Sequence, residues 1–262
     1  MVKVKNIAIQ IEELAPKALK EDYDNVGLMV GDKDQIIKKV LLALDCTNDV
    51  LDEAIDNQVD MIITHHPLLF KKPRNITADD LLGNKIIRLI KNDISLYSCH
   101  TNLDSAKNGI NDTVVSMLGF HSNNIIEPKE GENSECGIGR IVKLNKPLLL
   151  EDLVKVIKEK LNIKSLRVVK GNKEVNTIAV INGNGQDLFY SAKSLGADCI
   201  ITGDTTYHFV SDFKEMNISI IDAGHFKTEY LAFLKTLEFL KEKFKEVEFI
   251  ESKANDDPYE FI

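Results

Sequence analysis

Apolar and polar positions along this chain alternate between two periods, and the alternation predicts a βαβ architecture. Apolar runs of four to six residues are typical of buried strands, and apolar residues spaced three and four apart indicate helices. The predicted strands span residues 39–44, 61–63, 94–99, 177–181, 199–201 and 218–221. The predicted helices span about residues 49–55, 78–91, 109–118, 186–195 and 225–245, the first of them capped by Asp49. Short apolar strands joined by crossover helices predict an α/β protein with mostly parallel sheets flanked by helices.

The second half of the chain repeats part of the first. Residues 59–66 (VDMIITHH) resemble residues 197–204 (ADCIITGD) at a constant offset of 138. Residues 100–104 (HTNLD) resemble residues 225–229 (HFKTE) at an offset of 125, and both read His-x-x-x-carboxylate. An internal duplication into two similar α/β domains is therefore expected, with a cleft between them that gathers these polar ends.

The predicted boundary between the two domains is the polar stretch 127–135, which contains proline, glycine and asparagine. It divides the chain into residues 1–126 and 127–262, and the last helix could pack back on the first domain. The segment from Cys136 to Val169 has the pattern of a strand, a helix over 150–161 and a second strand.

Composition narrows the class of protein. A chain of 262 residues with 44% hydrophobic residues can bury a sizeable core. A net charge of -8 argues against a nucleic-acid partner, and the basic run 71–74 (KKPR) is typical of a solvated loop. The sequence shows neither a targeting segment nor an apolar run near the ~20 residues of a membrane span, so a cytoplasmic protein without a membrane partner is expected. The four cysteines form no C-x-x-C pair, which argues against a zinc-thiolate site or a disulfide framework.

Histidines and carboxylates cluster in the repeated segments, which contain four of the six histidines. His65 and His66 end a predicted strand, and open α/β sheets bind ligands just beyond the carboxyl ends of their strands. His225 and Glu229 are four apart at the start of a predicted helix, which places them on one helical face, as metal ligands require.

Each group also has a plainer interpretation. His65 and His66 could be a hydrogen-bonded surface pair, and Glu229 a solvated carboxylate near a helix N-terminus. His100 and Asp104 form the matching pair, in which Asp104 could simply cap the next helix. The occurrence of all three groups at strand ends of one duplicated framework favours a shared metal site.

Imidazole and carboxylate ligands without thiolates suit Zn, Mn, Fe or Co. Five or six ligands exceed the needs of one zinc ion with an open position, so two divalent ions fit better; such a pair supports hydrolysis.

His208, at the start of a predicted helix, is a candidate for proton transfer, although a first-turn histidine is commonly just polar. The loop 182–185 (NGNG) could hold a phosphate on its backbone amides but lacks the full Gly-x-Gly-x-x-Gly spacing.

Several motifs in combination resemble the Ngg-interacting-factor-three-like family, whose members are commonly named GTP cyclohydrolase 1 type 2 homologues. The matching segments are 23–28 (YDNVGL), 44–47 (LDCT), 63–67 (ITHHP), 100–104 (HTNLD), 202–204 (TGD) and 224–229 (GHFKTE). The resemblance spans nearly the whole chain. Two departures stand out: Tyr23 replaces a frequent tryptophan, and the loop 182–185 replaces a loop often rich in glycine and serine.

The resemblance implies a ring-shaped homohexamer with a dinuclear metal site between the two domains of each chain. The implied metal ligands are His65, His66, Asp104, His225 and Glu229, with Glu229 bridging the ions. His100 would stand close by, behind the ligands or as an auxiliary one.

Three hypotheses follow for function. The first is a metal-dependent hydrolase of a nucleotide or related heterocycle, with GTP cyclohydrolase-like activity implied by resemblance alone and with His100 or His208 relaying protons. The second is a non-enzymatic metal-binding or regulatory protein whose ion organises the assembly. The third, a nucleic-acid-binding ring, is disfavoured by the acidic balance of the chain.

Overall fold

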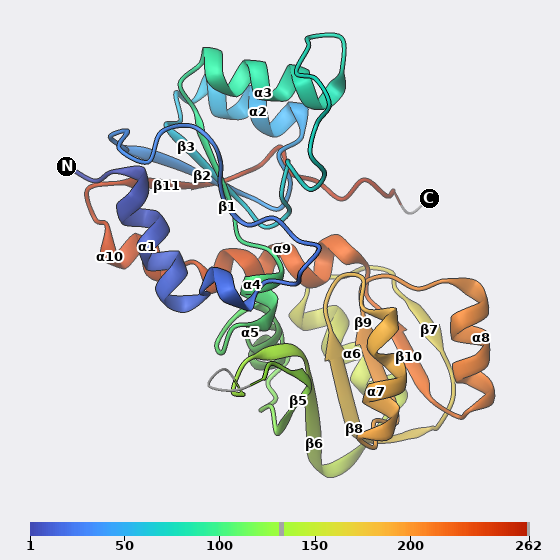
Figure 1. Ribbon diagram of the computed structural model, residues 1–262. Helices are drawn as coiled ribbons and strands as arrows, with labels where there is room; N and C mark the ends of the chain where they lie inside the picture. The colour runs from blue at the N-terminus through green and yellow to red at the C-terminus, as the bar shows by residue number, and fades with distance from the viewer. Residues whose placement is uncertain (131–133, 261–262) are drawn as a thin grey trace. The chain divides into compact units, whose positions relative to one another are not determined.

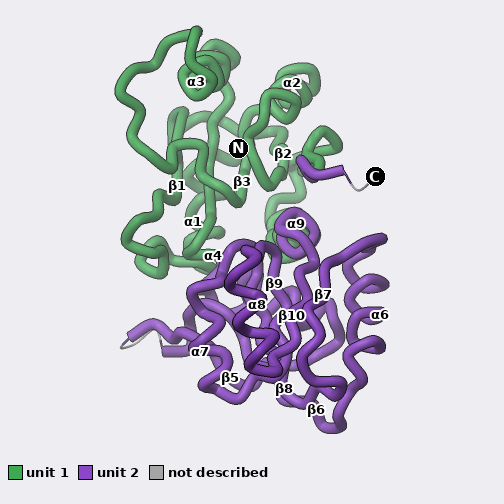
Figure 2. Tube along the Cα trace, turned by 90° about the vertical axis from the view of Figure 1, so that its right-hand side faces the viewer, with its two compact units in different colours: residues 1–103, 233–256 green, residues 104–232, 257–262 purple. Residues whose placement is uncertain are grey.

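The computed structural model describes residues 1–130 and 134–260. By its internal contacts the chain divides into two compact units, shown in two colours in Figure 2. Unit 1 comprises residues 1–103 and 233–256, and unit 2 comprises residues 104–232 with the segment that starts at 257. The division falls inside helices α4 (Thr101–Ser105) and α9 (His225–Thr236).

Unit 1 is built on a five-stranded sheet in the order β1-β4-β3-β2-β11. Its strands are β1 (Gly27–Val30), β2 (Lys39–Ala43), β3 (Met61–Thr64), β4 (Ser95–Ser98) and β11 (Glu248–Glu251). All neighbours are parallel except the edge strand β1, which runs antiparallel to β4. The helices are α1 (Val4–Leu14), η1 (Lys17–Leu19), α2 (Asn48–Asp56), α3 (Leu81–Lys91) and α10 (Phe239–Lys243).

The core of unit 1 follows from the pleat of its sheet. Leu41, Ile62 and Leu96 lie side by side on one face and pack against α2 and α3. Figure 1 shows these two helices together above the sheet. Side chains on the opposite face are equally buried, and the Tyr97 hydroxyl donates to Glu12 on α1 at 3.1 Å. Burial on both faces explains why these strands are continuous apolar runs rather than alternating ones.

Unit 2 contains a six-stranded sheet in the order β5-β6-β8-β9-β10-β7. Its strands are β5 (Asn124–Pro128), β6 (Gly137–Leu149), β7 (Arg167–Val169), β8 (Glu174–Ile181), β9 (Cys199–Thr202) and β10 (Ser219–Asp222). Its other helices are α5 (Ile110–Met117), α6 (Leu150–Lys160), η3 (Gln186–Leu188), α7 (Phe189–Ser194) and α8 (Tyr207–Glu215). Strands β8, β9 and β10 are parallel, and the edge strand β7 runs antiparallel to β10. Phe189 of α7 and Phe213 of α8 pack on Ile200 of the central strand.

Strand register supports the duplication. One row of the first sheet joins Val40, Met61 and Ser95. One row of the second sheet joins Ile178, Cys199 and Ser219. The first two strands of each trio therefore correspond at the offset of 138 found in the sequence. Both trios are also bordered by an antiparallel edge strand, β1 and β7 respectively.

The register of the third strand of each trio, β4 and β10, shifts the sequence match between residues 100–104 and 225–229 by one residue. Ser95 and Ser219 occupy equivalent rows, which gives an offset of 124 rather than 125. At this offset His100 corresponds to Gly224, and Thr101 corresponds to His225. The helices agree, because α4 begins at Thr101 and α9 begins at His225. The two His-x-x-x-carboxylate motifs are thus similar in sequence but shifted by one position in the fold.

The division into units differs from the predicted boundary at residues 127–135. Strand β5 ends at Pro128 and pairs with β6, which in turn pairs with β8, so these segments share one sheet. Residues 131–133 lie outside the described residues. At the other end of the chain, β11 pairs in parallel with β2, which joins the last strand to unit 1.

Two local predictions also differ from the structure. The N-cap of α2 is Thr47, whose Oγ1 accepts from the Val50 amide at 3.1 Å, whereas Asp49 lies inside the first turn. The helix predicted over 225–245 is two helices, α9 and α10, because i→i+3 hydrogen bonds from Leu240 to Leu237 and from Lys241 to Glu238 tighten the chain there.

None of the helices in the described part of the chain combines the length and the hydrophobicity that crossing a bilayer requires.

Candidate metal-binding site

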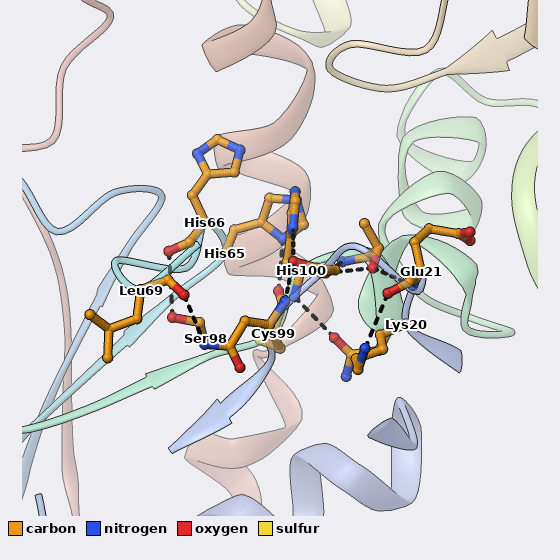
Figure 3. Close-up of polar contacts among 12 residues, drawn as sticks. Lys20, Glu21, His65, His66, Leu69, Ser98, Cys99 and His100 are labelled. Atoms are coloured by element: carbon orange, nitrogen blue, oxygen red, sulfur yellow. Dashed lines mark hydrogen bonds and ion pairs between the residues drawn. The ribbon is translucent and has the colours of Figure 1, made fainter. Parts of the chain in front are cut away.

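Three histidines of unit 1 lie together beyond the carboxyl ends of β3 and β4, as Figure 3 shows. The ring centroids of His65 and His66 are 5.0 Å apart, those of His65 and His100 are 5.1 Å apart, and those of His66 and His100 are 5.5 Å apart. One nitrogen from each ring lies within 4.8 Å of the other two. Because metal–nitrogen bonds of about 2.1 Å hold two ligand atoms at most about 4.2 Å apart, small ring rotations would bring the three rings onto one ion.

The parallel register of β3 and β4 produces this grouping. Thr64 and Ser98 are paired neighbours, and their hydroxyl oxygens are 2.8 Å apart. The Thr64 hydroxyl also contacts the His66 carbonyl oxygen at 2.8 Å, which holds the turn that follows β3. This turn lets two consecutive side chains face the same place, which a regular strand would not allow.

Each of these rings is held at its Nδ1 atom by a hydrogen-bond acceptor. His65 Nδ1 lies 2.8 Å from the Cys99 carbonyl oxygen, and His66 Nδ1 lies 2.9 Å from Asp45 Oδ1. His100 Nδ1 lies 2.9 Å from Asp24 Oδ1. A carbonyl or carboxylate can only accept, so each Nδ1 carries a proton, and Nε2 is the nitrogen that offers a lone pair in the neutral form of each ring. Metal-binding histidines are oriented in this way.

Asp24 is the most enclosed of these acceptors, with a fully buried side chain. Burial by itself would raise the pKa of this carboxyl group. Hydrogen bonds from His100 and from the hydroxyl and amide of Thr101 more than offset burial and hold the pKa of Asp24 well below its ordinary value. Asp24 is therefore an ionised group that fixes the His100 ring.

In unit 2, His225 and Glu229 form a pair on the first turns of α9. His225 Nε2 lies 2.9 Å from Glu229 Oε2, in agreement with their i,i+4 spacing. His225 Nδ1 lies 2.8 Å from Asp204 Oδ2, so this ring too is held by an acceptor at Nδ1. Glu229 is only 4% exposed, which makes it a buried carboxylate and not the solvated one of the plainer interpretation.

Two glycines make room for this pair. A Cβ atom on Gly183 would lie 2.1 Å from Glu229 Oε1 and 3.3 Å from His225 Cε1, and a Cβ atom on Gly203 would lie 2.8 Å from His225 Cα. The Gly183 carbonyl oxygen accepts from the amides of Gly203 and Asp204 at 3.0 Å each, which ties the two loops together. The loop 182–185 thus packs directly behind His225 and Glu229.

Asp104 and His208 complete the set of predicted site residues. Asp104 is half-buried on α4 in unit 2, and its carbonyl oxygen accepts from the Asn111 side chain at 3.0 Å. His208 is exposed on α8, where its ring contacts Tyr207 edge-on at 5.3 Å. His208 does not belong to either ligand group described above, and its catalytic role stays a prediction. The roles of His100 and Asp104 stay predictions as well.

The acceptors Asp24, Asp45 and Asp204 were not singled out by sequence reasoning as partners of the histidines. Each belongs to a motif quoted above, but its partner lies at least 21 residues away in the sequence. The signal that could have found them is their position, since Asp45 and Asp204 each lie two residues beyond a strand that ends near the ligands.

The residues fit a divalent transition metal. Unit 1 offers three imidazoles that are each held at Nδ1, and unit 2 offers the His225 imidazole with the buried Glu229 carboxylate, for which Gly183 leaves room. This donor set suits Zn, Mn, Fe or Co.

Comparison with known proteins agrees with the architecture. The family described as Duf34/NIF3 (NGG1p interacting factor 3) matches residues 2–258. The chain belongs to this family. It is 54% identical over 263 residues to a Clostridium perfringens protein named GTP cyclohydrolase 1 type 2 homolog, with 100% of both chains covered. It is 31% identical to NIF3-like protein 1 of Drosophila melanogaster, with 87% of this chain and 78% of the relative covered.

Solved structures of other proteins share the fold. A hypothetical protein from Staphylococcus aureus superimposes with a TM-score of 0.90 at 30% identity, covering 99% of each chain. Reduced HcgD from Methanocaldococcus jannaschii superimposes with a TM-score of 0.83 at 34% identity, covering 96% of this chain and 98% of that one. These likenesses confirm the α/β fold class and the family expected from the motifs.

Proposed function

We propose that this protein is a metal-dependent hydrolase of a nucleotide or a related heterocycle, with two divalent ions held by His65, His66, Asp104, His225 and Glu229. The observation that carries the proposal is the common orientation of the histidines. In both units the Nδ1 atoms are bonded to acceptors, and in unit 2 the Nε2 atom of His225 lies 2.9 Å from the Glu229 carboxylate, so Nε2 is the nitrogen that we assign to a metal ion in each ring. A set of purely structural histidines would not need the same nitrogen presented each time.

The roles of the residues follow from their surroundings. Two ions, when bound, would activate water and stabilise negative charge on the substrate. Asp45 and Asp204 orient His66 and His225 through their Nδ1 atoms. Glu229, buried with one oxygen beside Gly183 and the other 2.9 Å from His225 Nε2, would hold metal through a fixed carboxylate. His100, hydrogen-bonded to the ionised Asp24, is suited to hold a proton at Nδ1.

The choice of a nucleotide or heterocycle as substrate class is supported by the names of the relatives. The Clostridium perfringens relative is named as a homolog of GTP cyclohydrolase 1 type 2, an enzyme class that acts on GTP. A family name does not fix the substrate of a member, because the same fold hosts many activities. We further propose that the chain assembles as a homohexamer in the cytoplasm.

The experiment that tests this function is elemental analysis of the purified protein beside the variant Glu229→Ala, with turnover of nucleotides measured on the same samples. We expect close to two transition-metal ions per wild-type chain, and loss of metal and turnover together in the variant. Full turnover by metal-free Glu229→Ala would contradict the hydrolytic mechanism. No metal after reconstitution with Zn, Mn and Fe would mean that the cluster is structural.

A second candidate is a non-enzymatic metal-binding or regulatory protein. The fully buried ring of His65 favours it, because an ion bound there would be sequestered from solvent. This candidate predicts the same metal content but no turnover of any nucleotide. Dissociation of the assembly on chelation would support the organising role of the ion.

A further inference from the structure

We propose that Phe70 and Tyr23 form the wall on which the heteroaromatic base of a nucleotide stacks, while Lys71, Lys72 and Arg74 bind its phosphate. This inference rests on the proposed function, because it places the base beside His100. It adds residues that determine the substrate class, and these residues do not overlap with the metal ligands.

The first observation is a pair of exposed aromatic rings next to the histidine group. The Phe70 ring lies 6.4 Å from the His100 ring, and the Tyr23 ring lies 6.3 Å from the Phe70 ring, both in edge-on arrangements. Phe70 is 43% exposed and Tyr23 is 66% exposed. One exposed aromatic residue is unremarkable on a protein surface, but two in contact beside a candidate catalytic histidine offer open apolar faces to a planar ligand.

The backbone near both rings is anchored to the elements that position His100. The Asn25 side-chain amide donates to the Leu69 carbonyl oxygen at 2.8 Å, which fixes the residue before Phe70. Tyr23 directly precedes Asp24, whose carboxylate holds His100. The rings are therefore exposed at their faces and fixed at their backbones, and a pre-organised surface of this kind reduces the entropy lost on binding.

The second observation is charge. Three of the four residues that follow Phe70 are cations, and all three are exposed. In the described residues, neither Lys71, Lys72 nor Arg74 has an ion pair. The next carboxylates along the chain are Asp79 and Asp80, and Asp80 is used to cap α3 through the Gly83 amide at 2.9 Å.

A net charge of -8 over the whole chain makes this local run of cations stand out. A cationic segment joined directly to an aromatic wall is complementary to a ligand with a planar base and a phosphate. Free bases lack the anion, and sugar phosphates lack the ring, so the nucleotide is the class that uses both features.

The test uses the absence of tryptophan from this sequence. The variant Phe70→Trp introduces a single indole at the proposed wall and keeps a planar ring there. We expect GMP and guanosine to quench its emission and ribose 5-phosphate to leave it unchanged. By calorimetry, Phe70→Leu should raise the Kd for GMP about tenfold, and Phe70→Trp should change it less than about twofold.

The phosphate half of the proposal is tested with the double variant Lys71→Ala/Lys72→Ala. It should weaken GMP binding and flatten its salt dependence, while guanosine binding stays as in the wild type. Ile76→Ala, an exposed apolar position of the same segment, and Lys91→Ala, an exposed cation on α3, serve as matched controls that should bind GMP normally.

Metal content measured on the same samples separates this inference from the proposed function. If Phe70→Leu and the wild type bind GMP equally, or if neither binds it, the aromatic wall is wrong even when two ions are present. If the wild type holds no metal but still binds GMP through Phe70, the hydrolase proposal fails and the nucleotide site stands.

Discussion

At the scale of single residues, the candidate ligands are recognisable from the sequence but their orientation is not. Histidines and carboxylates at strand ends and at i,i+4 spacing suggest His65, His66, His225 and Glu229 as ligands, and that role stays a prediction. The acceptors that fix the rings lie far away in the sequence, as Asp24 does from His100. The space for Glu229 depends on Gly183, which the sequence presented only as part of a glycine-rich loop.

Gly183→Ala should remove metal and lower stability. The new Cβ atom would lie 2.1 Å from Glu229 Oε1, so the carboxylate must move away from His225. The positive φ of 54° also disfavours alanine, by about 1–2 kcal/mol. Gly196→Ala is the matched control, because its φ is 89° and no atom lies within 4 Å of its Cβ position. We expect both variants to unfold at lower urea concentration, Gly183→Ala more so because of its clash, and we expect loss of metal, by elemental analysis, only for Gly183→Ala. Equal metal content in the two variants would show that metal binding does not need the space that Gly183 leaves for Glu229.

Asp24 should make stability depend on pH in the acid range. Its folded-state pKa lies below the ordinary value of 3.8, so the unfolded chain takes up the proton first as pH falls. The stability contributed by the ionised group is thus fully present above about pH 5 and decreases as pH falls below about 4 toward the folded-state pKa. Urea unfolding of chelator-treated protein should give a higher free energy of unfolding for the wild type than for Asp24→Asn at pH 7. The difference between the two free energies should be smaller at pH 3. A gap that is constant with pH would contradict this assignment.

At the scale of helices and strands, periodicity located most elements within a few residues. The strands at 39–44, 61–63 and 199–201 were placed correctly because strands buried on both faces are uniformly apolar. The predicted helix ends were less accurate than the predicted strands, because a cap depends on one hydrogen bond that several nearby side chains could form. Thr47 and Asp49 both have suitable side chains, and only the path of the chain after β2 selects Thr47.

The cap assignment predicts unequal effects of two neighbouring substitutions. Thr47→Ala should lower the free energy of unfolding by about 1 kcal/mol, because the Val50 amide loses its acceptor. Asp49→Ala removes only a favourable charge near the N-terminus of α2 and should cost about 0.3–1 kcal/mol, decreasing with added salt. Urea titrations at low and high salt would measure both. If Asp49→Ala lowered the free energy of unfolding more than Thr47→Ala does, and independently of salt, Asp49 would be the cap.

At the scale of the whole molecule, strand register supports the duplication expected from the sequence, and the two compact units divide the chain at other residues than the predicted boundary. The polar stretch at 127–135 has the composition of a linker, yet β5 and β6 on either side of it belong to one sheet. The structure keeps the offset of 138 because the segments matched at this offset include strands, where insertions are rare. The offset of 125 was wrong by one residue because it was matched across the turn after a strand, where only hydrogen-bonded register shows which residues correspond.

Thiol reactivity offers a test of the packing throughout both units. Cys46, Cys99 and Cys199 are buried, and Cys136 is partly exposed. Burial raises the pKa of Cys46 to about 11 and raises that of Cys199 further, so both remain protonated and unreactive near neutral pH. Iodoacetamide at pH 8 should therefore add to one thiol of the folded protein and to all four in urea, as counted by mass spectrometry. Two or more adducts on the folded protein would show that a core is open.

The sequence by itself determined the α/β class and the order of most elements, and it indicated the duplication and the residue types of the candidate site. It could do so because strand and helix periods, and the chemistry of imidazole and carboxylate, are local properties. The tertiary structure decided which strands are neighbours, where the units divide, which acceptor holds each histidine and where Phe70 lies relative to His100. Those features join residues distant in the chain, and they depend on register, on backbone turns and on the space left by single glycines, which local patterns do not encode.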